Sequence, residues 1–237
     1  MKKQGKLFLV PTYLSKDNEA TFITPLVKEV IQHTSHYFAE NVRTARRFIG
    51  SLKLGIQIEE LEFIVLDKKS NWDQMYPLYE PIRQGKDMAV ISEAGVPCLA
   101  DPGNLAVSFA HQTGVSVVPL PGTSSIQMAL IASGFNGQQF TFHGYLPIDK
   151  NERQKKIREL EKQARGGYTQ LFMETPYRNH QLVKDIIKTC SPDTLLSIAA
   201  DISGKHEFIR TELVRKWKTT DIQIHKIPAI FSFGQFP

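Results

Sequence analysis

One segment, residues 88–125, restricts the fold of this chain more than any other, because it repeats one pattern of local structure twice. Its first four residues are a short continuous apolar run, which is typical of a buried parallel strand. A turn rich in glycine and proline follows, and apolar residues then recur at helical spacing across residues 105–110. Residues 115–120 begin the same succession again, with a second turn at residues 121–125. We therefore predict an α/β fold with both turns at the carboxyl ends of parallel strands, where open α/β sheets bind ligands.

Apolar runs elsewhere predict the remaining elements. In the first half they indicate strands at residues 7–10, 37–39 and 63–66, a helix beginning at Thr24 and Pro25, and helices at residues 44–52 and 72–84. In the second half they indicate a helix at residues 154–163 and strands at residues 140–142, 170–173, 195–200, 207–211 and 229–233. Because these later strands follow one another with less intervening helix, we expect a mixed sheet with antiparallel members. The stiff link around Pro119 and Pro121 gives predicted domains of residues 1–119 and 120–237.

The sequence predicts local structural roles for two polar residues of segment 88–125. Asn104 is expected to cap the helix that follows it, since asparagine is a favoured residue at that position. Asp101 either closes an Asx-type turn with its own carboxylate or shapes a ligand pocket. The sequence leaves these two roles of Asp101 open.

Composition excludes several classes of protein. The chain has 237 residues, 41% of them hydrophobic and 22% charged, which is ordinary for a globular protein. No apolar run reaches the roughly 18 residues of a membrane span, and the basic N-terminus leads into a strand rather than a secretory signal. Cys98 and Cys190 are far apart and form no CxxC motif, which indicates a reducing compartment. We expect a cytoplasmic protein with no membrane segment.

The charge balance suits an anionic partner without requiring one. The formal net charge is +5, and some of the excess lies in a basic run at residues 150–158. A solvated helix face is the more common reason for such a run. Few aromatic residues are interleaved with it, so the run gives little support for single-stranded RNA binding by itself.

Several common catalytic signatures are missing from the sequence. It contains no GxGxxG, no GxxxxGK[ST] and no GxSxG, which disfavours dinucleotide-dependent redox, kinase-like and hydrolase chemistry. No cysteine and histidine cluster has metal-ligand spacing, so we expect no metal site. His33 and His36 are three residues apart with no third ligand nearby, and are interpreted as surface or interface residues.

Five short motifs occur in order along the chain: SEAGVP, DPG, PLPG, HGYLP at residues 143–147 and METPYR at residues 173–178. In this order and spacing they resemble the tetrapyrrole methylase superfamily, and within it most closely the ribosomal RNA small subunit methyltransferase I branch. The resemblance covers nearly the whole chain. It implies a two-domain α/β architecture of the tetrapyrrole methylase kind. The N-terminal sheet would be mostly parallel and flanked by helices, the C-terminal sheet would be mixed, and a cofactor cleft would lie between the domains.

The resemblance also implies an activity and partners. These are methyl transfer from S-adenosylmethionine, ribose 2′-O-methylation of a cytidine in small-subunit ribosomal RNA, and a homodimer. One alternative is a C-methyltransferase acting on a tetrapyrrole of the uroporphyrinogen or precorrin kind. Another is a non-catalytic member of the family that binds S-adenosylmethionine or RNA. The basic composition and the closer resemblance favour the RNA methyltransferase.

By the same resemblance, a set of residues on the turns contacts the cofactor: Pro11, Thr12, Glu93, Ala94, Gly95, Ser124, Ser125 and Tyr145. Glycine-rich turns suit this task because their backbone groups approach a ligand without an obstructing Cβ. The chain departs from the usual family motifs at the first loop, which reads PTYLS rather than TPIGN. It also has Glu93 in place of Asp, Val96 in place of Thr, and Tyr177 in place of His. These departures keep the cofactor frame and change positions that face the substrate.

A ribose hydroxyl is a poor nucleophile and benefits from a general base. We expect Glu93 or Glu40 to act as this base, and Arg43 and Arg178 to hold an anionic group of the substrate, because all four follow predicted strand ends. The catalytic set is therefore Glu93, Glu40 and Arg43. An ion pair between Glu40 and Arg43 is the alternative to a role in catalysis.

Overall fold

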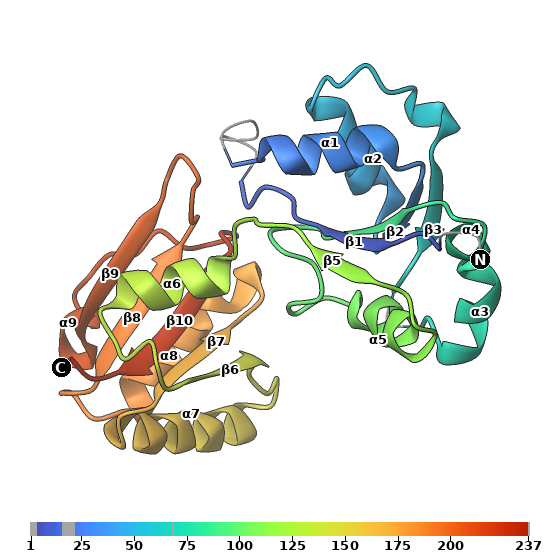
Figure 1. Ribbon diagram of the computed structural model, residues 1–237. Coiled ribbons are helices and arrows are strands. Elements are labelled where there is room, and N and C mark those ends of the chain that lie inside the picture. Colours follow the sequence, from blue (N-terminus) through green and yellow to red (C-terminus); the bar gives the residue numbers. More distant parts are fainter. Residues whose placement is uncertain (1–3, 16–21, 68, 237) are drawn as a thin grey trace. The chain divides into compact units, whose positions relative to one another are not determined.

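Two separate β-sheets organise the chain, one in each of two units, Met1–Ser124 and Ser125–Pro237. The computed structural model describes residues 4–15, 22–67 and 69–236 (Figure 1). The predicted domain boundary after residue 119 coincides with the end of strand β5 (Val117–Pro119). It stays a prediction about independently folding domains.

Every strand pair described in the sheet of the N-terminal unit is parallel, in line with the mostly parallel sheet expected. Its strands follow the order β3-β2-β4-β1-β5. Besides β5 they are β1 (Leu7–Val10), β2 (His36–Ala39), β3 (Glu62–Val65) and β4 (Met88–Ile91). Neighbouring residues of β2 point to opposite faces: Tyr37 packs beneath one layer of helices and Phe38 beneath the other. Burial on both faces explains why the strands read as continuous apolar runs.

Helices cover both faces of this sheet (Figure 1). On one face lie α1 (Pro25–His33) and α2 (Val42–Ser51). On the other lie α5 (Asn104–Gln112) and three short helices, η3 (Trp72–Gln74), α3 (Met75–Leu78) and α4 (Glu80–Arg83). A 3-10 turn, η2 (Ile58–Glu60), precedes β3. This layered arrangement leaves the carboxyl edge of the sheet to the loops.

The ends of these helices confirm one prediction and correct three. Thr24 caps α1, accepting a hydrogen bond from the Val27 amide at 3.3 Å with Pro25 in the first turn. The second helix begins at Val42 rather than Thr44, because Asn41 caps it. Asn104 does not cap α5: it is the first helical residue, and Gly103 precedes it with no capping side chain. The predicted helix over residues 72–84 is broken into η3, α3 and α4, since a proline at position 81 has no amide to bond back into the preceding turn.

The sheet of the C-terminal unit is mixed, which confirms the expectation from its closely spaced strands. The order is β6-β7-β10-β8-β9, with β6 and β7 parallel and the other neighbours antiparallel. The strands are β6 (Phe140–Tyr145), β7 (Thr169–Met173), β8 (Leu195–Ala200), β9 (Phe208–Leu213) and β10 (Ala229–Gly234). The carboxyl ends of β6 and β7 therefore lie at the same edge, and one of the predicted motifs begins within the end of each strand.

Three helices pack against one face of this mixed sheet. They are α7 (Lys150–Arg165), α8 (Asn179–Thr189) and α9 (Val214–Trp217), and they share an apolar core with Phe172 and Phe231. The 3-10 turn η4 (Pro176–Arg178) leads into α8. Helix α6 (Ser125–Ser133) packs over the opposite face (Figure 1). Across the described residues, no helix combines the length and the apolar composition that crossing a bilayer requires.

Candidate functional site

Three loops interlock at the carboxyl edge of the N-terminal sheet. The loop after β1 contacts the loop after β4 through the Thr12 amide, which donates to the Gly95 carbonyl at 2.9 Å. The Ser92 hydroxyl also donates to the Gly95 carbonyl, and its oxygen lies 3.3 Å from the Thr12 hydroxyl oxygen. Thr12 and Ser92 are both buried. The two predicted cofactor loops are thus held together by backbone and hydroxyl groups.

The loop after β5 joins this arrangement through two glycines. Gly95 has a φ of +73°, and a Cβ there would lie 2.9 Å from the Thr123 carbonyl oxygen. A Cβ on Gly122 would overlap the ring of Pro11. The backbones of the three loops therefore approach more closely than side chains would allow. Next to these glycines the Thr123 hydroxyl is buried, and it has no hydrogen-bond partner among the described residues.

The predicted cofactor residues divide between this loop cluster and the second unit. Pro11, Thr12 and Gly95 are in direct contact in the cluster, as described above, and Ser124 is buried at its border. Glu93 and Ala94 are exposed on the same turn as Gly95. Ser125 begins α6, and Tyr145 ends β6 with 56% of its surface exposed. Cofactor contact by each of these residues stays a prediction.

Beside the loop cluster, the two predicted acidic residues line one pocket. Glu40 follows β2 and Glu93 follows β4, and these strands are neighbours in the sheet. Asp101 and Gly103 lie along the wall of the same small pocket. Glu40 and Glu93, each predicted from a strand end, thus lie at the same edge of the sheet, and the role of either in catalysis stays a prediction.

The surroundings of Glu93 favour its protonated form. Partial burial raises the pKa of its carboxyl group, and the neighbouring Glu40 carboxylate raises the pKa further by repulsion. A hydrogen bond with the Thr44 side chain acts in the opposite direction. The net result is a raised pKa, which makes the ionised form of Glu93 a stronger base than an ordinary glutamate.

Arg43 lies in the first turn of α2. Asn41 caps this helix and accepts from the Arg43 amide at 3.0 Å. The Arg43 side chain is exposed, and among the described residues no ion pair joins it to Glu40. The alternative role for these two residues, an ion pair with each other, is therefore not found.

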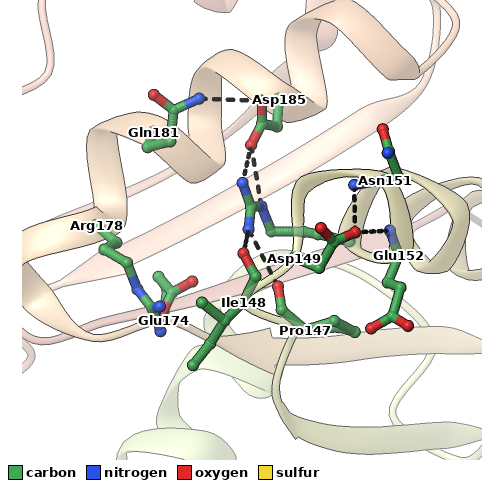
Figure 2. Close-up of polar contacts among 10 residues, drawn as sticks. Pro147, Ile148, Asp149, Asn151, Glu152, Glu174, Arg178, Gln181 and Asp185 are labelled. Carbon is green, nitrogen blue, oxygen red and sulfur yellow. Dashed lines mark hydrogen bonds and ion pairs between the residues drawn. The ribbon is translucent and has the colours of Figure 1, made fainter.

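Arg178 is engaged by a carboxylate within its own motif. Glu174 is 4% exposed, and its Oε1 accepts from Arg178 Nη2 at 2.6 Å and from Nε at 3.1 Å. The same oxygen accepts from the Thr175 amide at 2.6 Å. Figure 2 shows the two side chains against one another beside the start of α8. Arg178 thus has a structural role, since it pairs with the buried Glu174 carboxylate. Its contact with the substrate stays a prediction.

Sequence reasoning missed a buried ion pair in the C-terminal unit. Arg153 and Asp185 are 7% and 1% exposed, and Asp185 Oδ2 accepts from Arg153 Nη2 at 2.7 Å and from Nε at 3.0 Å. Arg153 Nη1 also donates to the carbonyls of Pro147 at 3.1 Å and Ile148 at 2.6 Å (Figure 2). The pair therefore fastens the end of the HGYLP motif, two and three residues after Tyr145, to α8. The available signal was Asp185 itself, a charged residue between Leu182 and Ile186 on the apolar face of a helix.

The remaining predicted features have local explanations. Asp101 closes an Asx turn: its Oδ1 accepts from the amides of Cys98 at 2.7 Å and Gly103 at 2.8 Å. His33 is exposed, as expected, whereas His36 is buried on β2 with its Nε2 3.5 Å from a carboxylate oxygen of Glu62. The described part of the chain holds no group of three or more metal-ligating side chains.

Comparisons with known proteins agree with this architecture. A family model described as Tetrapyrrole (Corrin/Porphyrin) Methylases matches residues 22–216. Among solved structures, the crystal structure of the methyltransferase CobJ has the same fold, with a TM-score of 0.64 at 16% identity over 98% of this chain and 94% of that chain.

Several relatives carry the name "Ribosomal RNA small subunit methyltransferase I", among them proteins from Buchnera aphidicola and Thermotoga maritima. The protein from Buchnera aphidicola subsp. Schizaphis graminum is 27% identical, over 95% of this chain and 76% of its own length. The protein from Thermotoga maritima is 30% identical, over 87% of both chains. Because the family model extends over parts of both units, the chain belongs to the Tetrapyrrole (Corrin/Porphyrin) Methylases, a family of methyltransferases.

Proposed function

We propose that this methyltransferase transfers the methyl group of S-adenosylmethionine to the ribose 2′-hydroxyl of a cytidine in small-subunit ribosomal RNA. The observation that carries the proposal is the likeness to proteins named "Ribosomal RNA small subunit methyltransferase I", which spans 95% of this chain for the Buchnera relative. A sequence pI of about 9.1 is consistent with a polyanionic substrate.

The interlocked loops of the N-terminal unit fit the proposed cofactor. An adenosine and an amino-acid group need hydrogen-bond partners and close backbone approach. The loops that carry Thr12, Gly95 and Ser124 bring several backbone segments together at this edge of the sheet, with glycine at the points of closest approach. The unpartnered Thr123 hydroxyl lies beside them. We assign cofactor contact to Pro11, Thr12, Glu93, Ala94, Gly95 and Ser124, with Ser125 and Tyr145 as further contacts.

The bound cofactor supplies an electrophilic methyl group, and the residues of this chain supply orientation and proton removal. Glu93, ionised, accepts the proton of the attacking hydroxyl, and the neighbouring carboxylate of Glu40 strengthens it as a base. Arg43 is exposed and provides positive charge for a substrate phosphate. Arg178 is the less available of the two arginines, because Glu174 already holds its guanidinium.

The proposal extends to assembly and location. We assign the protein to the cytoplasm, where small-subunit ribosomal RNA would be available to it, and to a homodimer. Light scattering at micromolar concentration tests the assembly: twice the chain mass of 26.9 kDa is expected, and the mass of one chain contradicts the homodimer.

The activity is tested by transfer of a radiolabelled methyl group from S-adenosylmethionine. Purified protein is incubated with small ribosomal subunits, and separately with naked ribosomal RNA, from a strain that lacks this methyltransferase. We expect the label to be released by ribonuclease. We also expect the linkage after the labelled cytidine to resist alkaline hydrolysis, because a 2′-O-methyl group blocks the hydroxyl that drives cleavage. Label in a base rather than a ribose would contradict the 2′-O position.

The same assay separates the alternatives. Label transferred from a mixed extract into an acid-soluble pigment, with none in RNA, would identify a tetrapyrrole C-methyltransferase. Cofactor binding by calorimetry without transfer to any fraction would identify a non-catalytic binding protein. Either result overturns the proposed function.

A further inference from the structure

Tyr177 projects from the C-terminal unit with its ring available to a partner. It is the middle residue of η4, and 71% of its surface is exposed. Two groups of a neighbouring loop flank it: Lys226 Nζ lies 5.7 Å from the ring centroid, and the His225 ring lies 6.4 Å away at 86°. The His180 ring in turn lies 6.1 Å from that of His225. Nitrogen-bearing side chains therefore surround an exposed aromatic ring at this place.

The backbone fixes this arrangement. Asn179 is fully buried, and its amide donates to the carbonyls of Ile224 at 3.1 Å and Ile227 at 2.7 Å. The Lys226 amide donates to the Pro176 carbonyl at 3.1 Å, and Lys226 has a φ of +61°. A non-glycine residue takes this left-handed conformation only where its surroundings hold it. The loop with His225 and Lys226 is therefore preorganised against η4.

The surrounding charge is positive. His180, Lys184 and Lys188 are exposed and spaced four residues apart, so they share one face of α8. The carboxylates of this region, Glu174 and Asp185, are buried and paired with arginines. In the adjacent loop, Asp221 is the exposed carboxylate, and it accepts from Gln223 at 2.9 Å. The exposed charge of α8 next to Tyr177 thus comes from lysines.

The Tyr177 surface, defined as Tyr177, His180, Lys184, Lys188, His225 and Lys226, lies near a predicted cofactor residue of the same unit. Tyr145 is in register with Met173 across the parallel strands β6 and β7. Tyr177 follows Met173 closely, so its motif leaves the sheet at the edge where Tyr145 stands.

We propose that the Tyr177 surface binds a single-stranded segment of the RNA substrate: a base stacks on Tyr177, and Lys226 and the α8 lysines contact the adjoining phosphates. Stacking on aromatic rings combined with cations along the backbone is the recognition chemistry of unpaired RNA. A duplex offers no free base face to the ring, so a paired RNA would use only the lysines. This proposal rests on the proposed RNA substrate and names the part of the chain that holds it.

Fluorescence anisotropy with a labelled single-stranded oligoribonucleotide tests the proposal on the full chain. Tyr177→Ala is expected to weaken RNA binding about tenfold, because it removes the ring on which the base stacks. Tyr177→Trp is expected to retain binding, because it keeps an aromatic ring. Lys226→Asn, which tolerates the left-handed conformation, is expected to reduce the slope of log affinity against log salt by about 0.7. Tyr76→Ala is the matched control, because Tyr76 is 64% exposed in the N-terminal unit with the Arg83 guanidinium 4.2 Å from its ring centroid. It is expected to bind RNA as the unmodified protein does.

Three results would overturn the proposal. They are wild-type affinity for Tyr177→Ala, equal affinity of the unmodified protein for duplex and single-stranded RNA, and equal loss of affinity in Tyr76→Ala. Methyl transfer is measured in parallel so that the two proposals fail separately. RNA binding that depends on Tyr177, without methyl transfer to RNA, supports the surface and removes the proposed function. Methyl transfer to RNA, with unchanged RNA binding by Tyr177→Ala, supports the proposed function and removes the Tyr177 surface.

Discussion

At the scale of single residues, the proton affinity of Glu93 depends on two neighbours that act in opposite directions. Partial burial raises the pKa of Glu93 most; beyond that, the Glu40 carboxylate raises this pKa and the hydrogen bond with Thr44 lowers it. A general base works only when ionised, so activity is lost as the pH falls through this pKa. Removing either neighbour should therefore move the acid limb of the pH profile in a known direction.

We predict that Glu40→Gln moves the acid limb of kcat/KM to lower pH, and that Thr44→Val moves it to higher pH. The first change removes a repulsive charge and lowers the pKa of Glu93; the second removes a stabilising donor and raises it. Glu93→Gln should abolish turnover while cofactor affinity is retained. If Glu93→Gln keeps an unchanged profile, Glu93 is not the base, and loss of activity at every pH in Glu40→Gln alone would give that role to Glu40.

The pairing of Arg178 with Glu174 separates structural from substrate-binding effects. Arg178→Met leaves a buried carboxylate without its partner, and should lower the free energy of unfolding by about 1–3 kcal/mol, since Arg178 itself is partly exposed. The double variant Glu174→Gln, Arg178→Met removes both charges and should recover much of this loss. Denaturant unfolding measures stability, and methyl transfer measures KM for RNA. A raised KM that persists in the double variant is the expected signature of substrate contact, whereas recovery of both quantities would make Arg178 purely structural.

At the scale of elements, the buried pair Arg153–Asp185 joins two helices and one motif loop. Arg153→Met should destabilise the protein by about 3–5 kcal/mol, because Asp185 keeps its charge in a buried place. Arg153→Met with Asp185→Leu should be much less destabilised, since an apolar pair of similar volume avoids the uncompensated charge. If the Arg153–Asp185 pair also positions the HGYLP motif, the double variant will be stable but will bind S-adenosylmethionine more weakly, as measured by calorimetry. Unchanged cofactor affinity in the stable double variant would limit the pair to a structural role.

The sequence predicted the elements whose signals are local and missed those that depend on tertiary packing. Continuous apolar runs placed β1, β4 and β8 correctly, because their strands are buried on both faces of a sheet. The helix over residues 72–84 was wrong because apolar spacing outweighed the prolines within it.

Side-chain partners show the same limit. The local Asx turn of Asp101 was within reach of the sequence, as its partners are two and three residues away. The Arg153–Asp185 pair was not, because its members are 32 residues apart and Arg153 lies in a run that reads as a solvated helix face. Likewise, Glu40 and Glu93 were each predicted from strand ends, but only the strand order β2-β4 brings them to one pocket.

At the scale of the whole molecule, each unit has its own sheet and its own core, which should appear in unfolding. Phe48 belongs to a core of the N-terminal unit and Ile198 to that of the C-terminal unit, and both are at most 1% exposed. Separate cores of this kind unfold with limited coupling, so calorimetry of the full chain should depart from a single two-state transition. The two components are assigned by weakening one core at a time.

Phe48→Ala should lower the free energy of unfolding of the N-terminal unit, and Ile198→Ala that of the C-terminal unit. Each loss should be the several kcal/mol typical of truncating a buried side chain. S-adenosylmethionine at about 100 times its Kd should stabilise the component that Phe48→Ala weakens by about 2.7 kcal/mol, because the interlocked loops belong to the N-terminal unit. A single transition that both substitutions lower equally would contradict the independence of the cores. A ligand stabilises only the folded unit to which it binds. Stabilisation confined to the component that Ile198→Ala weakens would therefore rule out the loop cluster around Thr12 and Gly95 as the cofactor site.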